Sequence, residues 1–200
     1  MAASMSTRRI RLTQSLYVLV LLAVALTDGR ALEGLAGLAA QCAGFLLVAA
    51  GTLWRVWASV FIAGRKDTEV VDTGPYARCR HPLYFGSLVA GLGLALSTRS
   101  LVLTVALPAV LLVMLWLAIL REERLLRDRH DQRWVRYRER VPVLWPRLGA
   151  LPAAGRREVD LTVYGKAFLD AASVLCVWLL VISLDGLRAQ GAWAPLFRLP

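Results

Sequence analysis

Long apolar runs separated by short basic segments dominate this sequence of 200 residues. About 20 apolar residues in a helix cross a bilayer, and the chain has five apolar runs, of which the first and the third are shorter than that. The runs occupy residues 12–26, 32–62, 83–96, 101–120 and 167–184. The pattern therefore predicts an all-α polytopic membrane protein with about five transmembrane helices.

A different pattern follows the fourth run. Residues 121–140 mix many arginines with apolar side chains, which is typical of an amphipathic helix at a membrane surface. Pro142 ends this stretch, because proline is poorly tolerated inside a helix. We therefore expect a separate cytoplasmic amphipathic helix, with Trp134 and Tyr137 as anchors at the membrane interface.

Composition supports the membrane assignment. The chain is 58% hydrophobic, which leaves too little polar surface for a soluble domain. Its net charge of +10 does not indicate nucleic-acid binding, since no zinc-finger spacing, RNA-binding signature or basic-aromatic face accompanies it. We expect a membrane partner and no nucleic acid.

The basic residues also predict an orientation. If the amino terminus is cytoplasmic, the segments 1–13, 63–82 and 121–166 face the cytoplasm, and they hold most of the 24 Lys and Arg residues. Such a bias is typical of cytoplasmic loops, so we expect a cytoplasmic amino terminus and a carboxyl terminus outside. The first run also has features of a cleavable signal peptide, and this alternative is left open.

The three cysteines indicate no special chemistry. Cys42, Cys79 and Cys176 have neither the spacing of a metal site nor a pairing expected for a disulfide. Two of them lie in apolar runs. We expect buried free thiols and no metal ion.

The loop GPYARCRHPLY, residues 74–84, is the first candidate for function. Pro82 suits the first turn of a helix, where a missing N–H costs nothing. His81 would then stand at the start of that helix, where free N–H groups favour an anionic ligand group. The structural alternative is a capped membrane helix with an interfacial histidine and tyrosine.

Glu122 and Glu123 are the second candidate. Ionisable residues at the edge of a membrane span are costly and are commonly functional. These two carboxylates either form salt bridges with nearby arginines at helical spacing or hold a cationic or hydroxyl-rich ligand. The predicted orientation brings them to the same cytoplasmic face as the loop at 74–84.

The order of these motifs resembles a known superfamily. Along the chain come GPY, RHPxY, a helical hairpin, the glutamate pair and RVP. This arrangement is similar to the isoprenylcysteine carboxyl methyltransferase and phospholipid methyltransferase superfamily of integral membrane enzymes. The resemblance covers about residues 50–146 and implies N-terminal transmembrane helices in 1–49, a methyltransferase core in 50–146, and a linker with a C-terminal transmembrane helix in 147–200.

The resemblance implies a cytoplasmic pocket for S-adenosylmethionine and a lipophilic acceptor, either a lipid or a prenylated molecule, that reaches it from the bilayer. No catalytic residue is assigned, because methyl transfer depends mainly on alignment and exclusion of water. The cofactor-binding residues implied by the family pattern are Thr68, Glu69, Val70, Val71, Tyr76, His81, Pro82, Leu83, Tyr84 and Glu122.

Two departures from the family pattern concern the acceptor. Ala118 stands where the eukaryotic isoprenylcysteine enzymes carry an arginine for the substrate carboxylate, and Thr68 replaces the usual histidine. Arg55 and Arg121 are the candidates to bind an anionic substrate instead. The sequence therefore predicts S-adenosylmethionine-dependent methylation of a lipophilic acceptor. A phospholipid N-methyltransferase, a sterol reductase with a similar His-Pro-x-Tyr segment and a non-catalytic membrane scaffold remain as alternatives.

Overall fold

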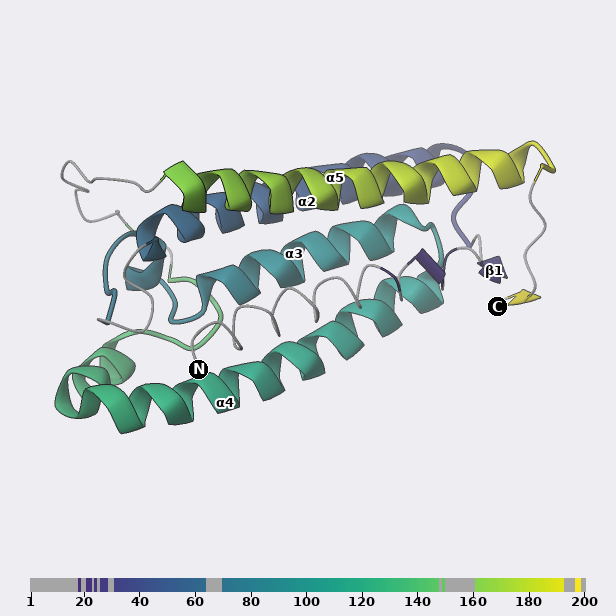
Figure 1. Cartoon of the computed structure of the whole chain (residues 1–200). Coiled ribbons are helices and arrows are strands. Elements are labelled where there is room, and N and C mark those ends of the chain that lie inside the picture. Colours follow the sequence, from purple (N-terminus) through teal and green to yellow (C-terminus); the bar gives the residue numbers. More distant parts are fainter. Residues whose placement is uncertain are drawn as a thin grey trace. The chain divides into compact units, whose positions relative to one another are not determined.

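Long helices form nearly all of the described structure (Figure 1). The structure is a computed structural model that describes residues 18, 21–22, 24, 26–28, 31–63, 70–147, 149, 161–192 and 197–198. The helices are α2 (Gly34–Ile62), α3 (Pro82–Ser97), α4 (Leu101–Arg140) and α5 (Leu161–Ala189), with the 3-10 turn η1 (Gly74–Ala77) before α3. The two-residue strands β1 (Thr27–Asp28) and β2 (Phe197–Arg198) pair in parallel. The predicted all-α class is confirmed.

Three of the described helices are long and apolar enough to cross a membrane. They are Gly34–Ile62, Leu101–Arg127 and Tyr164–Ala189, and α3 is a shorter apolar helix. These lengths support membrane association. The predicted first span, residues 12–26, lies mostly outside the described residues, although those described between 18 and 26 are helical. The predicted orientation and number of passes stay predictions.

Helix α4 differs from its prediction. It runs without interruption from Leu101 to Arg140, so the expectation of a separate amphipathic helix is wrong. Leucine, arginine and glutamate around residue 120 all favour helix, and no glycine or proline interrupts them. The last turns of α4 bend away from the rest of the helix (Figure 1). Pro142 follows the helix end, as the sequence predicted.

The chain divides into two compact units. The first unit comprises Met1–Ala49, Val89–Leu111 and Ser173–Pro200, and the second comprises Ala50–Leu88 and Leu112–Ala172. Each unit has its own apolar core. These units reflect contact density, whereas the predicted division at residues 49 and 146 concerns function and stays a prediction.

The first unit contains a buried polar group on α5. The Asp185 carboxylate lies 2.5 Å from the Arg99 guanidinium and accepts a hydrogen bond of 3.0 Å from the Gln41 side chain. Asp185 is only 6% exposed, and a buried carboxylate requires such partners. The Trp178 ring N–H likewise donates to the Ser97 hydroxyl at 2.9 Å. These contacts satisfy polar groups inside an apolar unit.

Glycines permit close helix contacts in both units. In the first unit, a Cβ added at Gly93 would lie 2.5 Å from the carbonyl oxygen of Gly44 on α2. In the second unit, a Cβ added at Gly86 would lie 2.7 Å from the carbonyl oxygen of Gly51. Only glycine fits where backbones approach this closely.

The cysteine prediction is partly wrong. All three thiols are free, as expected, but only Cys79 is buried, and Cys42 and Cys176 are exposed on helix surfaces. An apolar sequence around a cysteine in a membrane helix does not distinguish a side chain facing protein from one facing lipid.

Candidate functional site

The second unit brings the segment after α4 beside the loop that precedes α3. The N–H of Arg80 donates to the Pro142 carbonyl at 2.8 Å, and the N–H of His81 donates to the Val143 carbonyl at 3.1 Å. The N–H groups of Tyr84 and Phe85 both donate to the His81 carbonyl. The sequence predicted free N–H groups at the start of α3. That prediction is wrong for His81, Tyr84 and Phe85, whose N–H groups are all hydrogen-bonded.

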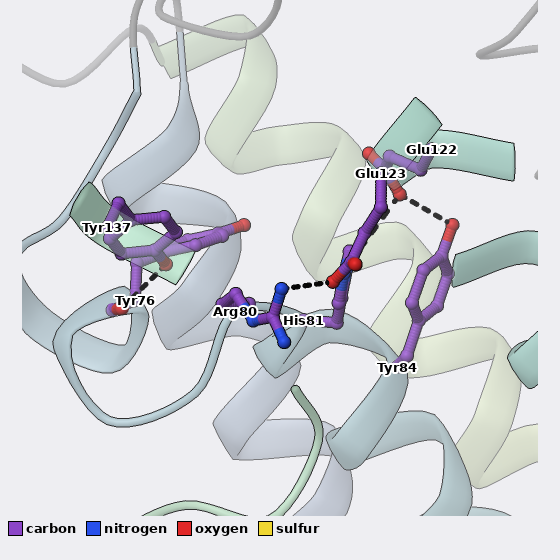
Figure 2. A network of polar contacts seen from close by, with 7 residues as sticks. All are labelled: Tyr76, Arg80, His81, Tyr84, Glu122, Glu123 and Tyr137. Carbon is purple, nitrogen blue, oxygen red and sulfur yellow. Dashed lines mark hydrogen bonds and ion pairs between the residues drawn. The ribbon is translucent and has the colours of Figure 1, made fainter. Parts of the chain in front are cut away.

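His81 lies between two carboxylates (Figure 2). Its Nε2 is 3.3 Å from Glu123 Oε1, and its Nδ1 is 3.8 Å from Glu122 Oε2. The Tyr84 hydroxyl donates to the same Glu122 oxygen at 3.0 Å, and the His81 and Tyr84 rings stack with centroids 5.6 Å apart. His81 is 6% exposed, so protein groups and not bulk water surround the imidazole. We call His81, Tyr84, Glu122, Glu123 and Arg80 the histidine cluster.

Arg80 supplies the cation of the histidine cluster. Its Nη1 lies 2.6 Å from Glu123 Oε1, and its guanidinium carbon is 6.0 Å from the centre of the Trp134 ring. Burial lowers the pKa of Arg80, while the negative charge of Glu123 opposes that change. A buried guanidinium is stable only when paired in this way.

Trp134 and Tyr137 are packed against protein. They are 2% and 3% exposed and form an apolar cluster with Val70. The Tyr137 hydroxyl donates to the Tyr76 carbonyl at 2.8 Å (Figure 2), and burial raises the pKa of Tyr137. The expectation that both rings anchor the chain at the membrane interface is wrong, since the bend in α4 turns them toward the loop at 70–76.

A cavity of about 460 Å³ lies beside this cluster. Its lining is rich in arginine and includes Val70, one of the predicted cofactor contacts. The lining residues are Val70, Asp72, Arg133, Arg136, Tyr137, Glu139 and Arg140. The space is large enough for part of a nucleoside-sized ligand.

Of the two arginines predicted for the substrate, Arg55 already has partners within the protein. The Arg55 guanidinium forms an ion pair with Asp170 of α5 and donates to the Ser87 hydroxyl of α3. Arg121 is exposed on α4. Arg55 is therefore already neutralised within the second unit.

The predicted cofactor residues form two groups. His81, Tyr84 and Glu122 meet in the histidine cluster, with Pro82 as the first residue of α3. Val71 and Tyr76 pack in one apolar cluster that Leu83 also contacts, and Val70 lines the cavity. Thr68 and Glu69 lie outside the described residues.

Three side chains in this region were not predicted as site residues: Arg80, Trp134 and Tyr137. Each belongs to a motif of the sequence, but only its contacts distinguish it from its neighbours. Among the described residues, no group of three or more His, Cys, Asp or Glu side chains is able to hold a metal ion.

The sequence profile of the phospholipid methyltransferase family matches residues 39–133. The chain belongs to this family. The matched range contains the histidine cluster and ends before the cavity residues at 136–140. Membership agrees with the predicted superfamily and makes the chain, at the level of the family, a membrane methyltransferase.

Two curated relatives are similar over most of the chain. The nickel-cobalt-cadmium resistance protein NccN of Alcaligenes xylosoxydans xylosoxydans is 33% identical over 78% of this chain and 72% of its own length. The cobalt-zinc-cadmium resistance protein CzcN of Cupriavidus metallidurans is 32% identical over 71% of this chain and 65% of its own length. No solved structure matches significantly.

Proposed function

We propose that the chain transfers a methyl group from S-adenosylmethionine to a lipophilic acceptor at the cytoplasmic face of the membrane. The observation that carries the proposal is the histidine cluster, in which Glu122 receives a hydrogen bond from Tyr84 beside the buried His81. Glu122 lies near the end of the apolar helix Leu101–Arg127. A carboxylate at that depth requires a function or a permanent partner.

The cluster suits the cationic part of the cofactor. S-adenosylmethionine carries a sulfonium, an ammonium, a carboxylate, a ribose and an adenine. Glu122 would accept hydrogen bonds from the ammonium or from ribose hydroxyls, and the Tyr84 ring would face a cation. The two carboxylates beside His81 would repel the carboxylate of the cofactor. His81 would therefore contact a hydrogen-bond donor of the cofactor instead. This revises the role that the sequence suggested for His81.

Methyl transfer needs no acid or base at the methyl carbon itself. The acceptor lone pair attacks the carbon while the carbon–sulfur bond breaks, and its electron pair remains on sulfur. Holding the two reactants in line and excluding water provide most of the rate. Buried side chains such as His81, at 6% exposure, would provide that exclusion.

The arrangement favours an acceptor with an amine head, as in a phospholipid N-methyltransferase. Such a head is an ammonium near neutral pH, so it must first lose a proton to solvent or to a carboxylate before its lone pair attacks the methyl carbon. Ala118 offers no charge, and Arg55 already pairs with Asp170. A buried anionic head would therefore lack Arg55 as a partner, and leaving the head unpaired would cost several kcal/mol. The names of the two relatives concern resistance to metal ions and name no methyl acceptor, so this class is inferred from the site.

Binding of S-adenosylhomocysteine to the purified protein, measured by calorimetry, tests the cofactor assignment. Glu122→Gln removes the charge but keeps the shape, and the affinity should fall by about 1.5–3 kcal/mol, as for a hydrogen bond to a charged group. Glu33→Gln, at an exposed carboxylate of the first unit, is the control. Unchanged affinity in both Glu122→Gln and His81→Ala would contradict the assignment.

A further inference from the structure

The contacts of Glu123 point to a role that differs from that of its neighbour Glu122. We infer that Arg80 and Glu123 are positioning residues, which hold His81 in the tautomer with its proton on Nε2 and so make Nδ1 a hydrogen-bond acceptor toward a bound ligand. The role of Nδ1 toward a bound ligand rests on the proposed function. The tautomer itself does not.

One oxygen atom of Glu123 orients both of its partners. Oε1 lies 2.6 Å from Arg80 Nη1 and 3.3 Å from His81 Nε2. A carboxylate paired with a guanidinium is ionised and can only accept hydrogen bonds. The histidine nitrogen that faces it must therefore carry the proton, and in the neutral ring the other nitrogen then has a lone pair.

That other nitrogen faces Glu122. His81 Nδ1 is 3.8 Å from Glu122 Oε2, which exceeds hydrogen-bond distance. The same oxygen accepts the Tyr84 hydroxyl at 3.0 Å, which fixes the carboxylate beside the stacked His81 ring. Two acceptors are thus held side by side at a spacing that one donor group can bridge. The ligand group that fits is an ammonium, because a hydroxyl has only one proton to donate.

The backbone limits other arrangements of the ring. The N–H of His81 bonds to the Val143 carbonyl, and Arg80 bonds to the Pro142 carbonyl. The imidazole is 5% exposed, so bulk water cannot replace Glu123 as the partner of Nε2. Without Glu123, the ring has no fixed acceptor at that nitrogen, and the choice of tautomer follows its remaining partners.

Nitrogen-15 NMR of histidine-labelled protein tests this directly, at mildly alkaline pH and without ligand. The chain has two histidines, His81 and His130, and the His130→Gln variant assigns the signals. We expect a protonated Nε2 and an unprotonated Nδ1 for His81. A protonated Nδ1, alone or together with Nε2, would overturn the inference.

The variants separate positioning from mere packing. Arg80→Met/Glu123→Met removes both charges together, so no buried cation is left unpaired, and it should yield a mixture of tautomers. Glu123→Gln keeps an acceptor oxygen and should retain the Nε2 proton, as should the control Glu33→Gln. An unchanged tautomer in the double variant would also overturn the inference.

The functional readout is the affinity for S-adenosylhomocysteine. We expect a loss of about tenfold or more in the double variant and a much smaller loss in Glu123→Gln. Equal affinities of wild type and double variant would refute the link to the ligand. Failure of the wild type to bind would refute the proposed function, whereas the tautomer could still be read.

Discussion

Burial makes Cys79 chemically different from the other two thiols. Cys79 is 0% exposed, and burial raises its pKa from an ordinary 9.0 to about 12, against the smaller lowering effect of the His81 backbone N–H. The thiolate is the reactive form. Since the folded-state pKa is the higher one, Cys79 should also stabilise the protein below about pH 9 and lose that contribution as the pH rises toward 12.

Alkylation of single-cysteine variants checks this difference. In detergent near neutral pH, a membrane-permeant maleimide should modify Cys176 readily and Cys79 only after unfolding. The two proteins to compare are Cys42→Ser/Cys176→Ser and Cys42→Ser/Cys79→Ser. Equal rates in the folded state would mean that Cys79 is accessible.

The sequence identified part of the histidine cluster and could not identify the rest. His81 and Tyr84 follow from the helix start at Pro82, and Glu122 follows from the family pattern. Glu123 is its neighbour on the same helix, about 100° further around the axis. Which carboxylate meets Arg80 and which meets Tyr84 depends on the rotation of α4, and no local pattern in the sequence determines that rotation.

At the scale of helices, Gly93 is a position where one added methyl group should destabilise the packing of α3 against α2. Its added Cβ would lie 2.5 Å from the Gly44 carbonyl oxygen and 2.7 Å from the Val48 nitrogen, both backbone atoms of α2. Gly93→Ala must therefore move α3 or α2 and should destabilise the first unit by about 1–3 kcal/mol. The control is Gly186→Ala in α5, where no atom lies within 4 Å.

Thermal unfolding in detergent compares the two variants. The control should be neutral or stabilised by about 0.5–1 kcal/mol, since alanine favours helix over glycine. An equal melting temperature of Gly93→Ala and the wild type would contradict the close contact between the two backbones.

Helix boundaries were predicted well where proline or a polar loop marks them, and poorly where nothing does. Helix α3 begins at Pro82 and α2 ends at Ile62, both as expected. The continuation of α4 beyond residue 120 was missed because a change from apolar to charged composition was taken as a break. Composition reports the surroundings of a helix and does not by itself mark where the helix ends.

At the scale of the whole molecule, the described helices establish a membrane-associated, all-α chain of the phospholipid methyltransferase family. The burial of Trp134 and Tyr137 could not be foreseen, because an aromatic ring suits a membrane interface and a protein interior equally well. That burial places the end of α4 against the loop at 70–76, near the predicted cofactor residues.

The measurement that tests the central claim most directly is transfer of a labelled methyl group from S-adenosylmethionine to lipids in membranes that contain the protein. We predict a labelled lipid product with the wild type and its loss in the Glu122→Gln/His81→Ala variant, at equal protein amounts. Membranes without the protein give the background. No labelled lipid above that background with the wild type, or equal labelling with the variant, would contradict the account.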